Sequence, residues 1–129
     1  MRTPLRTVAA LTLLAAAMSG CHGSSATFPF ERETVWRAAV GEATVWAPNR
    51  IDTEKYIIES TKTDLVSERH YELSVTRDPN LFARRPSTKV HVRMRQTQPR
   101  GIEFTRLERE FLIRLRAKLE VMVPPPPTQ

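Results

Sequence analysis

Residues 69–76 read RHYELSVT and residues 89–95 read KVHVRMR, and in both segments apolar and polar side chains alternate. Alternation with a period of two indicates strands of an antiparallel sheet that has one covered face and one solvated face. Residues 78–80 (Asp-Pro-Asn) begin a turn between the two strands. The apolar positions that we expect on the covered face are Tyr71, Leu73, Val75, Val90, Val92 and Met94.

Two segments before this pair complete the first half of the predicted fold. Residues 55–61 (KYIIEST) are rich in β-forming side chains and predict a further strand. Residues 30–47 predict a helix, which Pro48 ends because a proline disfavours helical geometry in the residue before it. The apolar stripe of this helix, at helical spacing, consists of Trp36, Ala39, Val40, Ala43 and Ala47.

Residues 104–122 predict the longest helix. Thr105 and Glu108 have the spacing of a capping box, in which each side chain bonds the other residue's backbone amide. Glu110 and Arg114 stand four positions apart, which favours an ion pair on the solvated side. The apolar stripe of this helix consists of Phe104, Leu107, Phe111, Leu112, Leu115, Leu119 and Met122.

The order of these elements is α-β-β-β-α, which predicts an α+β fold. The simplest packing is a three-stranded antiparallel meander with both helices on its apolar face. We assign residues 30–123 to this single domain and residues 124–129 to a Pro-rich tail. The order of elements, together with VWRAAV at residues 35–40, resembles the helix-grip domains of envelope lipoproteins that accompany outer-membrane protein assembly; the resemblance assigns no binding residue.

The chain begins with a basic and then apolar segment that ends at its one cysteine, MRTPLRTVAALTLLAAAMSGC. The apolar run, residues 8–18, is too short to span a bilayer, which needs about 20 residues, and it is typical of an export signal. Residues 18–21 (Met-Ser-Gly-Cys) resemble the lipobox of bacterial lipoprotein precursors, with Met18 where leucine is usual. The resemblance implies a diacylglyceryl group on Cys21, removal of residues 1–20 as signal peptide and acylation of the new amino terminus.

A soluble export signal cut after residues 15–17 is the alternative, and it would leave one unpaired thiol in an oxidising compartment. With the lipid anchor, we expect residues 21–29 to form a flexible tether. The predicted location is outside the cytoplasm, at the surface of the membrane that holds the lipid anchor. This membrane is the outer membrane, on its periplasmic side, if the host has one, because His22 rather than aspartate follows Cys21 in this resemblance.

The charge of the mature chain limits its partners. Loss of Arg2 and Arg6 leaves eighteen basic and fourteen acidic residues, a net charge of +4. For an exported protein, the anionic partners are lipid headgroups, acidic polymers or an acidic protein surface rather than nucleic acid. A charge of this size can also serve solubility alone.

The sequence lacks the motifs of common catalytic and cofactor sites. There is no G-x-S-x-G elbow, no glycine-rich phosphate loop, no H-E-x-x-H and no cysteine cluster, so we predict no enzyme, no cofactor and no metal site. His70 and His91 with Glu72 could bind a transition metal if the strand register brought them together. The alternative is that both histidines are ordinary surface residues.

Two surfaces are the candidate binding sites. Lys89, His91, Arg93 and Arg95 would form a positive row along one strand, either to meet anions or to protect a sheet edge from pairing. The segment 81–85 places an apolar pair beside two arginines, which suits a membrane interface or a partner groove, unless the apolar pair closes the core. The residues of this second candidate are Leu81, Phe82, Arg84 and Arg85.

Together these features favour a lipid-anchored protein of the cell envelope, a non-enzymatic structural or assembly accessory that binds another envelope component through its basic sheet face. The alternative is a lipoprotein that holds a small apolar or anionic ligand between helix and sheet.

Overall fold

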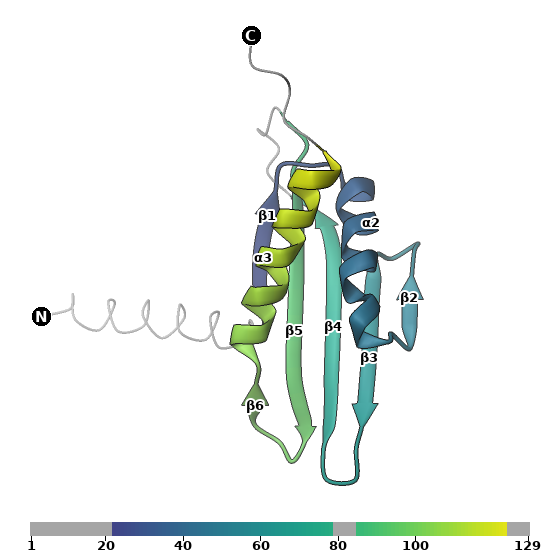
Figure 1. Ribbon diagram of the computed structural model, residues 1–129, viewed down its shortest axis with the longest axis vertical. Helices are drawn as coiled ribbons and strands as arrows, with labels where there is room; N and C mark the ends of the chain where they lie inside the picture. Colours follow the sequence, from purple (N-terminus) through teal and green to yellow (C-terminus); the bar gives the residue numbers. More distant parts are fainter. Residues whose placement is uncertain (1–21, 79–84, 124–129) are drawn as a thin grey trace, which may run out of the picture.

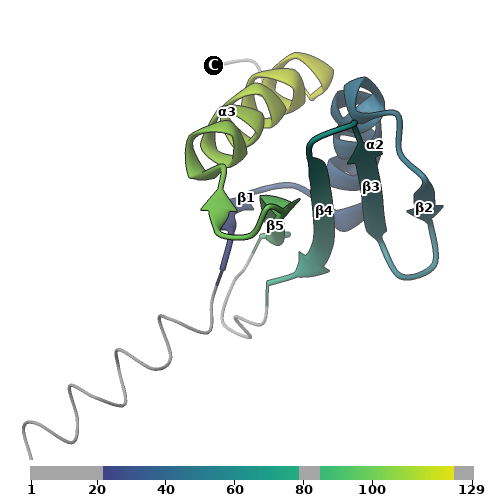
Figure 2. The ribbon, with the colours of Figure 1, turned by 90° about the horizontal axis from the view of Figure 1, so that it is seen from below.

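The computed structural model describes residues 22–78 and 85–123. In this part of the chain, two helices cover one face of a six-stranded antiparallel sheet (Figure 1, Figure 2). The predicted α+β class is therefore confirmed. The elements, in chain order, are β1 (Ser24–Phe28), α2 (Arg32–Ala43), the 3₁₀ helix η1 (Thr44–Trp46), β2 (Arg50–Asp52), β3 (Ile57–Thr63), β4 (Glu68–Arg77), β5 (Thr88–Gln98), β6 (Ile102–Glu103) and α3 (Thr105–Met122).

Strands β4 and β5 are the long central pair of the sheet, as their alternating sequences predict. Tyr71 lies opposite Met94 and Leu73 lies opposite Val92 in the antiparallel register. These side chains are at most 8% exposed, whereas the residues between them face away from the helices. One face of the pair is covered and the other is open, as expected.

The predicted three-stranded meander is too small, because it accounts only for β3, β4 and β5. The strand order is β1-β5-β4-β3-β2, and β6 also pairs with β5. Strand β1 comes from the segment predicted to be a flexible tether: Ser24 pairs with Val92 and Phe28 with Thr88. The tether prediction is wrong for residues 24–28, because the free edge of β5 offers this short polar segment a ladder of hydrogen bonds and the core buries Phe28.

Strand β5 is thus an inner strand, with β4 on one side and β1 and β6 on the other. The explanation of its basic residues as protection of a sheet edge is therefore wrong. Strands β1 and β6 lie one after the other along the same side of β5, since β1 pairs with residues 88–92 and β6 with residues 95–96.

A buried carboxylate fills the gap between these two short strands. The Met94 amide donates to Glu108 Oε2 at 2.7 Å, and the Ser24 hydroxyl donates to Glu108 Oε1 at 2.8 Å. The Met94 carbonyl accepts from the Phe104 amide at 2.8 Å. Glu108 is only 1% exposed, so a side chain of α3 completes the hydrogen bonding of β5 where no strand does.

The predicted capping box is wrong for this reason. The residue at the N-cap of α3 is Phe104, which makes no side-chain capping bond, and Thr105 is already helical. The predicted stripe of α3 is wrong at Leu107 and Met122, which are 42% and 43% exposed. At Leu107 the reason is that the neighbouring side chain of Glu108 takes the inward position near the start of the helix. The buried apolar residues of α3 are Phe111, Leu112, Leu115 and Leu119.

The space between helices and sheet is filled by large side chains. The rings of Trp46 and Phe111 lie 4.8 Å apart between centroids, and those of Trp46 and Tyr71 lie 5.7 Å apart. On the surface of α3, Glu110 pairs with Arg106 at 3.2 Å instead of the predicted Arg114. Arg114 instead approaches Glu42 of α2 at 3.8 Å, because α2 packs beside α3. Among the described residues, neither helix is both long and apolar enough to cross a membrane.

Candidate functional site

The four basic residues predicted as a row do lie on one face of β5. Lys89, His91, Arg93 and Arg95 alternate with buried Val90, Val92 and Met94, so they stand on the face that the helices leave open. Their neighbours on β4, given in the same order, are Thr76, Ser74, Glu72 and His70.

The open face is mixed in charge rather than uniformly basic. Arg93 Nη2 lies 3.0 Å from Glu103 Oε1 of β6, which neutralises one member of the row. His70 Nε2 lies 3.5 Å from Glu72 Oε2 on the same strand. Such partly exposed pairs contribute little to stability, but they lower the positive potential over the middle of the sheet.

The charge of Arg95, unlike that of Arg93, is not compensated by an acidic side chain. No hydrogen bond or ion pair joins its guanidinium to another residue in the part of the chain that the structure describes. The residue opposite is His70, which is not an acid. The Nε atoms of Arg93 and Arg95 are both buried and, among the described residues, without a hydrogen-bond acceptor. A buried N–H without an acceptor is costly, so an anion on these side chains would relieve the cost.

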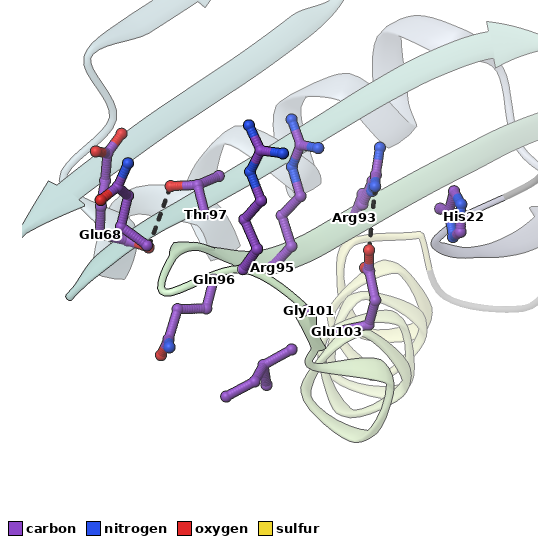
Figure 3. A pocket seen from close by; sticks show the side chains of 11 residues that line it. His22, Glu68, Arg93, Arg95, Gln96, Thr97, Gly101 and Glu103 are labelled. Atoms are coloured by element: carbon purple, nitrogen blue, oxygen red, sulfur yellow. Dashed lines mark hydrogen bonds and ion pairs between the residues drawn. The ribbon is translucent and has the colours of Figure 1, made fainter.

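Arg93 and Arg95 line a surface pocket of about 690 Å³ at the end of the sheet where β5 turns into β6 (Figure 3). In Figure 3 both side chains project from β5 in the same direction, and a dashed line joins Arg93 to Glu103. The full lining is His22, Glu68, Arg93, Arg95, Gln96, Thr97, Gln98, Arg100, Gly101, Ile102 and Glu103.

The start of the described chain is fixed against the same strand. The His22 carbonyl lies 2.9 Å from His91 Nε2. Gly23 has φ +102°, and a Cβ there would lie 2.7 Å from the Val92 carbonyl oxygen and 2.8 Å from the His91 ring. Only glycine tolerates this approach, so the chain just before β1 lies closely packed on β5 rather than loosely beside it.

The register separates the two histidines considered as metal ligands. His70 lies opposite Arg95, whereas His91 lies opposite Ser74. His70 Nδ1 instead lies 3.2 Å from the Thr61 hydroxyl. Within residues 22–78 and 85–123, no three His, Cys, Asp or Glu side chains are grouped so that they could hold a metal ion.

The second candidate surface falls mostly outside the described residues. Leu81, Phe82 and Arg84 lie there, as does Cys21. Arg85 is exposed and lines a separate pocket of about 490 Å³ with Tyr56 and others.

Sequence reasoning found Arg93 and Arg95 from their alternation but missed the other members of the pocket, His22, Arg100 and Glu103 among them. Glu103 and Arg100 lie beyond the end of β5, and only the return of the chain through β6 brings them back. His22 is more than sixty residues away from the strand it contacts. No local pattern predicts such neighbours.

Comparison with known proteins gives no relative: no protein family matches the chain, and no curated protein matches it.

Proposed function

We propose that this protein is a lipid-anchored component of the bacterial cell envelope that works without catalysis, as a structural or assembly accessory. In this proposal acyl chains on Cys21 hold the domain at a membrane surface, and the open face of the sheet contacts an anionic envelope component. The observation that carries the proposal is the lipobox-like segment 18–21, followed almost at once by a strand of the folded domain.

The short distance between anchor and fold supports a role at the membrane surface. Only His22 and Gly23 stand between Cys21 and the first residue of β1. Three residue steps extend to at most about 10 Å, so an anchored domain could not move far from the headgroups. A protein meant to reach across the periplasm would need a longer tether.

The packing of the core favours surface binding over the alternative of a ligand held between helix and sheet. Phe111, Leu115 and Leu119 of α3 are fully buried against the sheet, and Trp46 stacks near Phe111. These side chains occupy the space that such a ligand would need. By contrast, the open face carries the uncompensated Arg95.

The anchor is tested by expressing the full chain and Cys21→Ser in a bacterium and fractionating the cells, with chemical crosslinking before lysis. We expect the wild-type protein in the membrane fraction, with acylated Cys21 by intact mass and with crosslinks to envelope components. Cys21→Ser should lose the acyl mass and most crosslinks, because two or more acyl chains are what hold such a protein stably.

Ser25→Ala is a matched control, since it removes a nearby exposed hydroxyl and leaves the cysteine intact. It should fractionate like the wild type. An unacylated wild-type product, or a reporter fused downstream that remains in the cytoplasm, would overturn the proposal.

A further inference from the structure

We infer that the pocket around Arg95 and Arg100 binds the phosphate of an anionic phospholipid in the same bilayer that holds the anchor. The inference rests on the proposed function, which supplies the acyl chains on Cys21. It adds a defined site, a ligand class and an orientation of the domain on the membrane.

The first argument is position. His22 lines the pocket, and it is the residue directly after Cys21. Adjacent Cα atoms are 3.8 Å apart, so in the proposed function the lipid is attached one residue away from a residue that lines the pocket. In an S-diacylglyceryl cysteine, the Cys21 sulfur occupies the position on the glycerol backbone that the headgroup phosphate occupies in a phospholipid. The pocket would therefore lie at the depth where neighbouring phospholipids carry their phosphates.

The second argument is charge. Arg93, Arg95 and Arg100 line the pocket against Glu68 and Glu103. Glu103 is engaged with Arg93 through a 3.0 Å contact, and among the described residues neither Arg95 nor Arg100 forms an ion pair with an acid. Guanidinium groups bind phosphate oxygens through paired N–H donors, so two arginines at one pocket suit a headgroup phosphate.

The third argument is the apolar surface at the same end of the sheet. Leu65 is fully exposed and Val66 is 81% exposed at the turn between β3 and β4. This turn lies beside the turn between β5 and β6, at one end of the molecule (Figure 1). The register agrees, because Glu68 of the pocket opens β4 opposite Gln98. Exposed apolar side chains beside basic residues are typical of surfaces that rest in the interfacial region of a bilayer.

The test uses the protein expressed from the full chain, purified from membranes and reconstituted into vesicles of phosphatidylcholine alone or of equal parts phosphatidylcholine and phosphatidylglycerol. Phenylglyoxal modifies accessible arginines, and peptide mass spectrometry gives the rate at each position. Arg37, exposed on α2, serves as the internal reference. We expect Arg95 and Arg100 to react about fivefold more slowly in the anionic vesicles, relative to Arg37, because each basic side chain gains from an anionic surface.

Two variants test whether the protection belongs to the pocket. In Arg95→Gln, protection at Arg100 should fall, because the two guanidiniums share one phosphate. Arg77→Gln removes a charge at the opposite end of β4, where Arg77 pairs with Thr88, and should leave protection unchanged. Equal loss in both variants would overturn the inference, since it would show a general effect of net charge.

A further arm separates the lipid from a free anion. Inorganic phosphate is added to the phosphatidylcholine vesicles, and it should protect weakly. Protection equal to that of phosphatidylglycerol would overturn the assignment to a lipid. The same spectra report whether Cys21 is acylated. Acylated protein with unprotected arginines overturns the pocket inference alone, and unacylated protein whose arginines are protected overturns the anchor alone.

Discussion

The side chain of Glu108 accepts a backbone hydrogen bond of β5 that a neighbouring strand would otherwise accept. Its carboxylate accepts from a backbone amide of β5 and from the hydroxyl of Ser24, and so it joins α3, β5 and β1 at one point. A buried charge is tolerated where its oxygens are satisfied by donors, as they are here. The residue therefore links Ser24, near the start of the described chain, to the core of the domain.

Replacing Glu108 should destabilise the fold. Glu108→Leu keeps a similar side-chain volume but removes both acceptors, so the buried Met94 amide loses its partner and the Ser24 hydroxyl loses its acceptor. We expect a loss of about 1–3 kcal/mol in the free energy of unfolding, the cost of an unsatisfied buried polar group. Urea denaturation followed by tryptophan fluorescence measures this.

Glu110→Leu is the matched control, because Glu110 pairs with Arg106 on the surface. Its loss should stay within roughly 0.5 kcal/mol. Equal losses for the two variants would contradict the role given to Glu108.

A second prediction concerns Gly23 and the pairing of β1 with β5. In Gly23→Ala the Cβ would meet the Val92 carbonyl oxygen at 2.7 Å, and that oxygen cannot move without disturbing the pairing of β1 with β5. We expect faster hydrogen exchange at the amides of residues 24–28 and a lower free energy of unfolding.

Gly101→Ala is the control that separates the steric clash of the new Cβ from the free-energy cost of a positive φ angle. Gly101 also has positive φ, +106°, but a Cβ there has no atom within 4 Å. Gly101→Ala should lose about 1–2 kcal/mol through the left-handed conformation alone. Gly23→Ala should lose more, and a smaller loss than that of Gly101→Ala would contradict the close packing of residue 23 on β5.

At the scale of elements, the length of each helix or strand decided whether the sequence could predict it. The strands at residues 69–76 and 89–95 and the helix at 104–122 were predictable because each repeats its period several times. Strands β2 and β6 have three and two residues, too few for any period. Strand β1 alternates in burial, but its members are mostly serine, alanine and threonine, which carry little apolar signal.

The turn between β2 and β3 gives a prediction about pH. The pKa of Asp52 is lowered, chiefly by the Lys55 amide, which donates to its carboxylate at 2.9 Å, with help from Arg50 and the Glu54 amide. A lowered folded-state pKa means that ionised Asp52 stabilises the fold above its ordinary pKa of 3.8. This contribution is lost as the pH falls through the lowered value.

Asp52→Asn isolates this effect, since the asparagine oxygen can still accept from both amides. We expect the wild type to be more stable than Asp52→Asn at about pH 6 and the difference to shrink by about pH 2.5. Thermal melting of both proteins across this range measures it. A difference that did not change with pH would contradict a contribution from the charge.

At the scale of the whole molecule, the sequence predicted the class and the covered face but not the extent of the sheet. Alternation placed Arg93 and Arg95 on the open face, and the structure agrees. It could not place His22, Arg100 and Glu103 around them, because those contacts depend on which edges the chain returns to. The candidate site is thus half local pattern and half long-range topology.

The pairing of β1 with β5 also orders the events of folding. Sixty residues separate Phe28 from Thr88, the nearest pair in this ladder, whereas β3 and β4 are joined by a tight hairpin. Distant segments meet more slowly than adjacent ones, so the ladder closes late. A nascent chain emerging amino terminus first would therefore pass through a stage in which its opening segment waits unpaired. From the synthesis of β5 until this ladder closes, β5 would offer its vacant donors and acceptors to any extended peptide, and a chaperone that recognises open strands would compete directly with residues 24–28.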